Sequence, residues 1–462
     1  MLSTALVAID ATIIATAVPS VVAELGGFAE FPWLFSVYLL AQAVTVPVYG
    51  KLADVFGRKP VMLFGIGLFL VGSILCGLAW SMGSLIAFRA VQGLGAGAVQ
   101  PMSMTIAGDL YSLEERAKVQ GYLASVWAMS SVLGPTLGGV FSEYVSWRWI
   151  FFVNIPLCLI AAATIGLRFH EKVDRRRPRI DYAGAVVLTV ALTLLILGLL
   201  EGGQAWAWGS PQGVGVLLTG AVLLVVFVLL ERRAADPVVP LRLLRNRLLV
   251  ATNLVAACVG AVALGLTSYV PTFVQDVLGT GPLVAGFALA ALSLGWPVSA
   301  SQSGRVYLRI GFRSTAIIGA SVIVLGSALL LLLDEGSPVV QVGATSFVIG
   351  LGMGFCAAPT LIAAQSAVQW QQRGVVTGTN MFFRSAGSAV GVAVFGAIAN
   401  ATLGTSGVEG DVDPGALTTA VHHVFLATTV LAVVMLAAVL LMPRDRGRAR
   451  TTAPQPTEVA AG

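Results

Sequence analysis

The sequence predicts an all-α membrane protein in which two six-helix bundles flank an inserted helical hairpin, with fourteen transmembrane helices in total. Three observations predict this fold. Of the 462 residues, 57% are hydrophobic and only 11% are charged, whereas about a quarter of the residues in a soluble domain are charged. Apolar runs of about twenty residues, the length that crosses a bilayer as a helix, recur along the chain. Glycine and arginine patterns of the first half return in the second half.

Fourteen apolar windows are long enough to cross a bilayer. They lie at about residues 2–22, 31–50, 60–80, 83–108, 118–142, 147–168, 182–202, 212–231, 248–274, 283–303, 314–333, 338–363, 374–400 and 417–442. An even number of spans leaves both termini on one side of the membrane. The first window has no basic leader and contains Asp10, so we interpret it as a mature span and not as a cleavable signal.

The basic residues are distributed asymmetrically. All but three of the 27 lysines and arginines lie in loops or tails on the side of the termini, and the exceptions are Arg89, Arg148 and Arg384. Because cytoplasmic loops carry the excess of basic residues, we expect both termini in the cytoplasm. The net charge of +5 therefore reflects membrane topology, and no nucleic-acid partner is expected. Arginine far outnumbers lysine, which is typical of a GC-rich bacterium, so the expected location is a bacterial cell membrane.

The chain contains an internal repeat. Residues 303–313 repeat the glycine spacing and basic character of residues 50–59, 254 positions later, and the run Gly93, Gly95, Gly97 returns 257 positions later. Parallel repeats of six spans are the architecture of alternating-access transporters, with the substrate path between the halves. The expected organisation is an N-terminal bundle at 1–168, an inserted hairpin with its flanking loops at 169–246, a C-terminal bundle at 247–442 and a disordered tail at 443–462.

Residues 50–59 form the expected short basic connection between the second and third windows. Gly50 and Gly57 are expected to supply close approach or positive-φ backbone at the reversal. Asp54 is a single acid among cations near helix ends. It can accept hydrogen bonds from a helix N-terminus or pair with an arginine. The alternative is a simple positive-inside connector.

Two charged residues fall inside apolar windows of the first half. Asp10 lies about 14 Å into its helix at 1.5 Å per residue, which is close to the middle of a hydrocarbon core of about 30 Å. Burial favours the protonated form of such an acid, whereas a nearby arginine favours the ionised form. Arg89 enters from the opposite face and is long enough to approach the level of Asp10. The pair is therefore a candidate for proton coupling; a fixed structural pair is the alternative.

Small residues line one face of the fifth window. Ser130, Gly134 and Gly138 recur at four-residue spacing, which allows close approach of another helix. Pro135 removes one backbone donor and permits a kink. This pattern indicates helix packing that serves motion, or ordinary packing alone.

Arg384 lies at mid-membrane in the thirteenth window, and its own half offers no mid-span acid to neutralise it. It can extend to the interface, bond to carbonyls near Gly387, face water or reach Asp10. It is one of five candidate residues of a substrate cavity. The other four are Gln42, Trp127, Tyr269 and Asn380.

With these residues assembled, the chain resembles the major facilitator superfamily, and specifically its fourteen-span drug:proton antiporters of the EmrB/QacA type. Residues 50–59 are similar to the family's cytoplasmic signature, residues 89–93 to its span-4 motif, residues 134–139 to its span-5 antiporter motif and residues 10–19 to the span-1 motif of that branch. The resemblance covers essentially the whole chain.

The resemblance implies proton-driven efflux of bulky amphipathic, often cationic compounds. It implies that Arg89 acts in coupling and that Asp54 latches the cytoplasmic side, within a set of Gly50, Asp54, Gly57 and Arg58. The implied antiporter motif is Gly134, Pro135, Gly138 and Gly139. The chain departs from the branch at Ala15, where asparagine is common, at Ser130, where glycine is common, and at Leu308, where the second signature lacks its acid.

The leading hypothesis is therefore a monomeric exporter, in contact with the lipid bilayer, whose partners are a small molecule and protons. An exporter dedicated to a lipid, siderophore or antibiotic is the alternative, and a membrane-embedded enzyme or a channel is less favoured. No Walker sequence is present, so ATP is not expected to drive it. We expect no cofactor and no metal, because Cys76, Cys158, Cys258 and Cys356 all lie in separate apolar runs.

Overall fold

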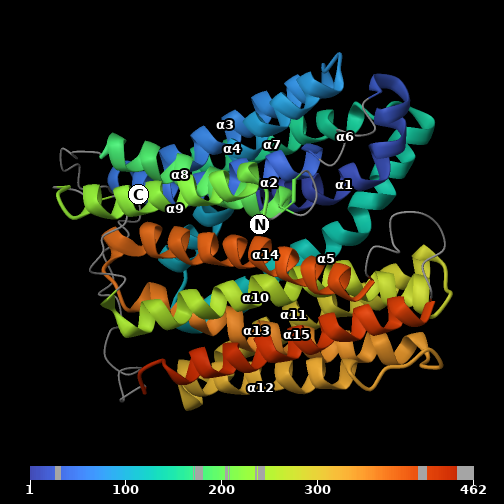
Figure 1. The fold of residues 1–462 in the computed structure, drawn as a ribbon. Helices are drawn as coiled ribbons and strands as arrows, with labels where there is room; N and C mark the ends of the chain where they lie inside the picture. The colour runs from blue at the N-terminus through green and yellow to red at the C-terminus, as the bar shows by residue number, and fades with distance from the viewer. Residues whose placement is uncertain are drawn as a thin grey trace.

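A computed structural model of the chain describes residues 1–26, 33–169, 171, 181–202, 206–207, 209–234, 237, 245–403 and 414–444. Within these residues the regular structure is helical, apart from one isolated bridge between Gly202 and Trp206. The long helices run side by side in two main groups, the earlier part of the chain above and the later part below in Figure 1.

The helices follow one another in the order α1 (Leu2–Leu25), α2 (Trp33–Phe56), α3 (Arg58–Gly77), α4 (Met82–Leu110), α5 (Leu113–Tyr144), α6 (Trp149–Phe152), α7 (Asn154–Arg168), α8 (Tyr182–Glu201), α9 (Pro211–Glu231), α10 (Arg247–Thr272), η2 (Phe273–Val277), α11 (Pro282–Ile310), α12 (Phe312–Leu330), α13 (Val339–Ser366), η3 (Trp370–Gln372), α14 (Arg373–Leu403) and α15 (Pro414–Leu440). We call α1–α7 the first helix group and α10–α15 the second helix group.

Twelve helical segments of the described residues are long and apolar enough to cross a membrane, so the protein is a multi-pass membrane protein. The expected windows at 2–22 and 118–142 are not among the twelve, and the expected count of fourteen is not supported. The reason lies in α1 and α5. The described apolar stretch of α1 ends at Ile14, and α5 begins with a charged segment, Glu114-Glu115-Arg116-Ala117-Lys118, and continues with polar and small residues.

The expected basic loops at 51–59 and 305–313 are almost entirely helical, so that expectation is wrong. Only Gly57 separates α2 from α3, and only Gly311 separates α11 from α12. Their φ angles are +98° and +87°, a region that glycine enters without steric cost. Helices that continue to such a glycine keep their backbone groups hydrogen-bonded up to the reversal, and the charged side chains around Gly57 include Arg58, which is buried. The two joints are 254 positions apart, as the repeat is.

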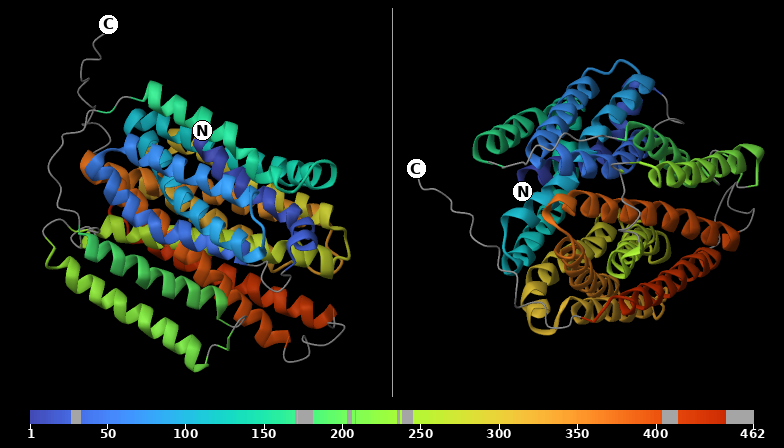
Figure 2. Two further views of the ribbon diagram at one scale, coloured as in Figure 1. Left: turned by 90° about the horizontal axis from the view of Figure 1, so that it is seen from above. Right: turned by 90° about the vertical axis from the view of Figure 1, so that its left-hand side faces the viewer.

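Buried side chains form several separate clusters. Two clusters draw their residues from α1–α4, α6 and α7, and the largest draws on α10–α13, α15 and η2. A further cluster joins the α8–α9 hairpin to both groups, with Leu40 of α2, Leu192 of α8, Phe227 of α9 and Ala389 of α14. The hairpin therefore packs on the flank where α2 meets α14, as the end-on view in Figure 2 shows.

Glycines permit the same close helix contact in both groups. A Cβ atom at Gly95 of α4 would lie 2.8 Å from the carbonyl oxygen of Gly65 on α3. A Cβ atom at Gly352 of α13 would lie 2.7 Å from the carbonyl oxygen of Gly319 on α12. Contacts this short with backbone atoms leave room only for glycine, because backbone cannot move aside as a flexible side chain can. The glycine runs noticed in the sequence therefore bring together α3 with α4 and α12 with α13.

We expect Gly95→Ala to destabilise the protein by about 1–3 kcal/mol through overpacking, because the new methyl group would also lie 2.4 Å from the backbone nitrogen of Phe69. Gly67 of α3 is the matched control, since a Cβ atom there meets nothing within 4 Å. Gly67→Ala should leave stability unchanged or raise it by up to about 1 kcal/mol, as helix propensity favours alanine. The measurement is the thermal unfolding midpoint in detergent, and equal midpoints for the two variants would contradict the argument.

Candidate functional site

A buried ion pair lies inside the first helix group. Nη1 of Arg89 on α4 is 2.6 Å from Oδ2 of Asp10 on α1. Both side chains are 1% exposed. Asp10 therefore points to neighbouring helices and not toward lipid.

Polar side chains from three helices complete the surroundings of Asp10. Its Oδ1 accepts hydrogen bonds from Nε2 of Gln92 at 2.7 Å and from Nδ2 of Asn154 at 3.1 Å. Gln92 and Asn154 also bond to Oγ of Ser73 on α3, at 2.8 and 3.4 Å. One carboxylate thus receives bonds from α4 and α7, and the network ties both helices to α3.

The guanidinium of Arg89 is held by further groups. Nε donates to the carbonyl oxygen of Leu34 at 3.2 Å, and Nη1 also donates to Oε1 of Gln92 at 2.6 Å. The cation lies 4.1 Å from the centroid of the Tyr38 ring, in the range of a cation–π interaction. Because burying a single charge is costly, removing one partner of such a pair typically destabilises a protein by about 3–5 kcal/mol. The arrangement therefore pairs the charge of Arg89 with the carboxylate of Asp10 inside the first helix group.

A second polar network lies at the end of the bundle that carries the basic residues 51–59 and 305–313, which we call the basic end. Asp54, near the end of α2, accepts hydrogen bonds from the backbone N–H groups of Gly374 and Val375, at 2.8 and 2.7 Å. These two residues form the first turn of α14, where unpaired N–H groups and the helix dipole favour an anion. Asp54 also lies 3.1 Å from Nη2 of Arg58. Asp54 thus accepts hydrogen bonds from a helix N-terminus and also pairs with an arginine, the two interactions that the sequence suggested for this acid.

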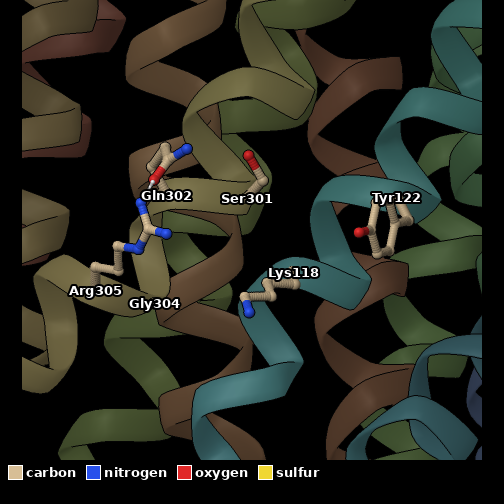
Figure 3. Close-up of a pocket in the computed structure, with 6 residues that line it drawn as sticks. All are labelled: Lys118, Tyr122, Ser301, Gln302, Gly304 and Arg305. Atoms are coloured by element: carbon tan, nitrogen blue, oxygen red, sulfur yellow. Dashed lines mark hydrogen bonds between the residues drawn. The ribbon is translucent and has the colours of Figure 1, made fainter.

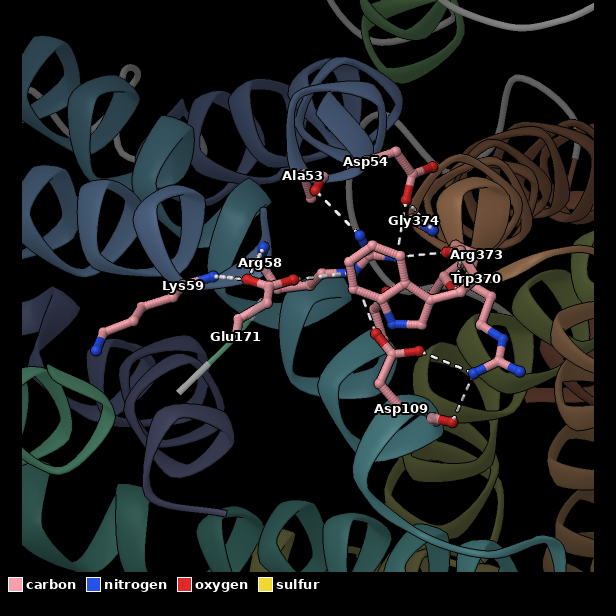
Figure 4. A network of polar contacts seen from close by, with 12 residues as sticks. Ala53, Asp54, Arg58, Lys59, Asp109, Glu171, Trp370, Arg373 and Gly374 are labelled. Carbon is pink, nitrogen blue, oxygen red and sulfur yellow. Dashed lines mark hydrogen bonds and ion pairs between the residues drawn. The ribbon is translucent and has the colours of Figure 1, made fainter. Parts of the chain in front are cut away.

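Arg58 is the centre of this second network (Figure 4), and its side chain is fully buried. Its Nε donates to Asp109 at 3.1 Å and its Nη2 donates to the carbonyl oxygen of Trp370 at 2.6 Å. The guanidinium also lies 3.7 Å from the centroid of the Trp370 indole. Oε2 of Glu171 accepts from the backbone N–H of Arg58 at 2.7 Å. One arginine of the first group thus binds the segment that leads into α14.

Other bonds join the two helix groups at the basic end. Arg373 of α14 donates to Asp109 of α4 at 3.0 Å, and the hydroxyl of Tyr307 on α11 donates to the carbonyl oxygen of Leu113 on α5. A Cβ atom at Gly50 would lie 2.7 Å from the carbonyl oxygen of Gly374, so α2 and α14 are in backbone contact. The basic end is therefore closed in this structure.

The small-residue stripe of α5 packs against α1. A Cβ atom at Gly134 would lie 2.0 Å from Oγ1 of Thr12, and Thr12 donates to the carbonyl oxygen of Ser130 at 2.8 Å. Gly138 is buried, whereas a Cβ atom at Gly139 would meet nothing within 4 Å. The side chain of Pro135 lies outside the described residues. Close helix approach thus involves part of the expected motif, and its partner is the helix that carries Asp10.

The five candidate cavity residues are dispersed over different contacts. Gln42 donates to Gln100 at 2.8 Å, and Asn380 donates to the carbonyl oxygen of Thr252 at 3.1 Å. Trp127 and Tyr269 pack against the cores of separate groups. Arg384 lies half-buried on α14, and no acidic partner for it occurs among the residues that the structure describes.

Sequence reasoning did not assign roles to several residues of the two networks. Gln92, Asn154 and Ser73 surround Asp10, and Asp109 and Trp370 surround Arg58. A usable signal existed for Asn154, because it is the one polar side chain in the stretch of residues 149–163. No comparable signal marks Trp370. It contacts Arg58 partly through its backbone carbonyl oxygen, a group that every residue has.

The fold and these networks define a multi-pass helical membrane protein with a charged pair buried in its first half. The model of the Major Facilitator Superfamily matches residues 1–392, and the chain belongs to this family, whose members are transporters and not enzymes. Multidrug resistance protein 3 of Bacillus subtilis is 36% identical over 393 residues, which cover 85% of this chain and 76% of that protein.

Two further similarities extend the comparison. The multidrug transporter protein MdtP of Bacillus subtilis is 35% identical over 399 residues, covering 86% of this chain and 73% of that protein. The crystal structure of the human organic anion transporter MFSD10 (TETRAN) superposes with a TM-score of 0.66 and 16% sequence identity, covering 95% of this chain and 98% of that one. The latter similarity concerns the fold alone.

Proposed function

We propose that this protein exports amphipathic small molecules, multidrug-type cations among them, across a bacterial cytoplasmic membrane in exchange for protons. The observation that carries the proposal is the ion pair between Asp10 and Arg89, both 1% exposed inside the first helix group. Two relatives that are 36% and 35% identical are named as a multidrug resistance protein and a multidrug transporter, which supports efflux of such compounds.

In the proposed mechanism, proton binding at Asp10 removes the negative charge that now holds Arg89. Arg89 is then free to shift toward Gln92 and Tyr38, which already contact it at 2.6 Å and 4.1 Å. If this shift changes how α1 and α4 pack, the proton affinity of Asp10 depends on conformation, and that dependence is what couples proton entry to export. The basic end corresponds to the cytoplasmic side in this proposal, and both termini lie there.

We further propose that α1 and α5 also cross the membrane, which gives the fourteen spans of the EmrB/QacA-type branch. The supporting observations are their lengths of 24 and 32 residues and their packing within the first helix group. The bundles then occupy residues 1–168 and 247–442, and the hairpin occupies 169–246. Transport proceeds by rocking of the two bundles about a path between them, and the protein acts as a monomer.

The proposed function is tested with purified protein in proteoliposomes. A cationic dye and an anionic dye of similar size are each supplied with an imposed pH gradient. We expect the cationic dye to accumulate against its own gradient only while the proton gradient persists, and a protonophore to abolish the accumulation. Dye movement that only follows its own gradient, with an electrical current and no proton dependence, would instead indicate a channel.

A dedicated exporter on the same scaffold is the second candidate, and one observation favours it. Arg384 lies on α14 without an acidic partner among the described residues, and an unpaired cation within a membrane protein favours an anionic group on the substrate. Uphill transport of the anionic dye alone in the assay above would support this candidate and would reject a preference for cations.

A further inference from the structure

A pocket of about 270 Å³ opens between α5 and α11 near the basic end (Figure 3). Six residues line it: Lys118, Tyr122, Ser301, Gln302, Gly304 and Arg305. The first two belong to α5 and the others to α11. The pocket therefore lies on the seam between the two helix groups, away from the Asp10 and Arg58 networks described above.

The pocket is positively charged. Lys118 and Arg305 approach it from opposite helices, both side chains are exposed, and none of the six lining residues is acidic. Arg305 donates to Oε1 of Gln302 at 3.0 Å, which uses one of its five N–H donors and leaves the others available. The acid Glu115, one turn before Lys118, accepts from the backbone N–H and the hydroxyl of Ser112, at 3.0 and 2.9 Å. The hydroxyl of Ser301 donates to the carbonyl oxygen of Val298 at 2.8 Å, so the charge of the pocket comes from Lys118 and Arg305.

Apolar side chains lead from the pocket toward the middle of the membrane. On α5, Tyr122 is followed on the same helix face by Met129, seven residues later, which is 61% exposed. On α11, Arg305 is preceded on the same face by Val298 and Leu294, which are 52% and 58% exposed. Residues seven and eleven apart share one face of a helix, and on α5 Leu133, eleven residues after Tyr122, is also exposed. Each helix therefore presents a row of exposed apolar side chains on the face that carries its cation, which we call its apolar stripe.

We propose that this pocket binds the phosphate headgroup of an anionic phospholipid, whose acyl chains lie along the two apolar stripes. Charge complementarity selects the headgroup, since basic pockets between helices at the cytoplasmic side attract anionic lipid phosphates. The volume of about 270 Å³ accommodates a phosphate headgroup and lies at the lower end of the range of about 300–1,000 Å³ for drug-sized ligands. The stripes favour a lipid over free phosphate, which has no apolar part.

Such a lipid would contact both helix groups at once. Next to the pocket, a Cβ atom at Gly121 of α5 would lie 2.5 Å from Cβ of Ser301 on α11, so the two helices touch here. A phosphate held by Lys118 and Arg305 together requires this contact, and separation of the helices would break one of its two ion pairs. The bound lipid therefore stabilises the closed basic end.

The test measures lipid retention, which does not depend on transport. Purified protein is mixed with phosphatidylglycerol or with phosphatidylcholine, and bound lipids are counted by native mass spectrometry. We expect phosphatidylglycerol to be retained and phosphatidylcholine to be lost. Each of Lys118→Ala and Arg305→Ala should weaken phosphatidylglycerol binding about fivefold, since one basic residue near a membrane surface contributes about that factor. The double variant should lose roughly 25-fold, if the two contributions are independent.

Arg309→Ala is the matched control, because Arg309 is an exposed arginine one turn further along α11 that does not line the pocket. It should retain the lipid as the unmodified protein does. Inorganic phosphate in millimolar excess distinguishes the source of the phosphate, and it should not displace the lipid. Equal retention of both lipids, an equal loss in the Arg309 variant, or full displacement by inorganic phosphate would each overturn the proposal.

Discussion

Asp10→Asn should reduce proton-driven uphill efflux to the level of protein-free vesicles while substrate binding persists. Asparagine has nearly the same shape and keeps an oxygen that can accept from Arg89, but it cannot release or bind a proton at physiological pH. The ion pair at 2.6 Å becomes a hydrogen bond from the charged guanidinium of Arg89 to a neutral amide oxygen, and the side chain at position 10 no longer changes its charge during the cycle. The measurement is dye accumulation in proteoliposomes under a pH gradient, together with dye binding by fluorescence titration.

Glu24→Gln is the control for Asp10. Glu24 lies on the same helix and pairs with Arg148 at 2.6 Å, but its side chain is 51% exposed. Exposed ion pairs typically contribute only about 0–1 kcal/mol, so this variant should transport normally. Undiminished proton-dependent accumulation by the Asp10 variant would show that the coupling acid lies elsewhere in the chain.

Asp54→Asn should shift the protein toward conformations in which the basic end is open. The carboxylate accepts two backbone hydrogen bonds from the first turn of α14, and an amide can accept only one while its NH2 group faces the second N–H. Hydrogen bonds to a charged group contribute about 1.5–3 kcal/mol each, so losing one should change the ratio of closed to open molecules by roughly tenfold or more. Electron paramagnetic resonance with spin labels at Phe64 and Ile310, both exposed and on different groups, measures the separation.

Glu115→Gln provides the comparison for Asp54. Glu115 is an acid near the same end, but its bonds go to Ser112 within its own helix start. Its replacement should leave the distribution of label distances unchanged. A distribution that is also unchanged in the Asp54 variant would mean that Arg58 and Arg373 hold the closed state without that carboxylate.

The positions of the helices could be predicted from the sequence because a bilayer demands apolar runs of about twenty residues. The window at 212–231 matches α9 at Pro211–Glu231, and the window at 182–202 matches α8 at Tyr182–Glu201. The residues around Gly57 were assigned to a loop because charge suggested solvent. Charged residues at helix ends are compatible with helix, however, and one positive-φ glycine was sufficient for the reversal.

The partners of the charged residues were only partly predictable. Arg89 was expected at the depth of Asp10, since depth follows from the 1.5 Å rise of a helix. The rotation of a helix about its axis decides which neighbour each side chain faces, and it does not follow from the sequence. A membrane helix can be apolar on every side and then has no polar face that would indicate this rotation. For this reason the sequence could not show that Asn154 bonds to Asp10 or that Asn380 bonds to α10.

The one-residue joint at Gly57 has a mechanical consequence. A long flexible loop would let α2 and α3 move independently of each other. A single residue between Phe56 and Arg58 allows almost no independent movement. Any tilt of α2 must then be accompanied by a movement of α3, because the connection between the two helices cannot take up the change. Asp54, just before Gly57, accepts a hydrogen bond from α14, and Arg58, just after it, donates one to the carbonyl oxygen of Trp370. These two contacts should therefore break together and not one after the other.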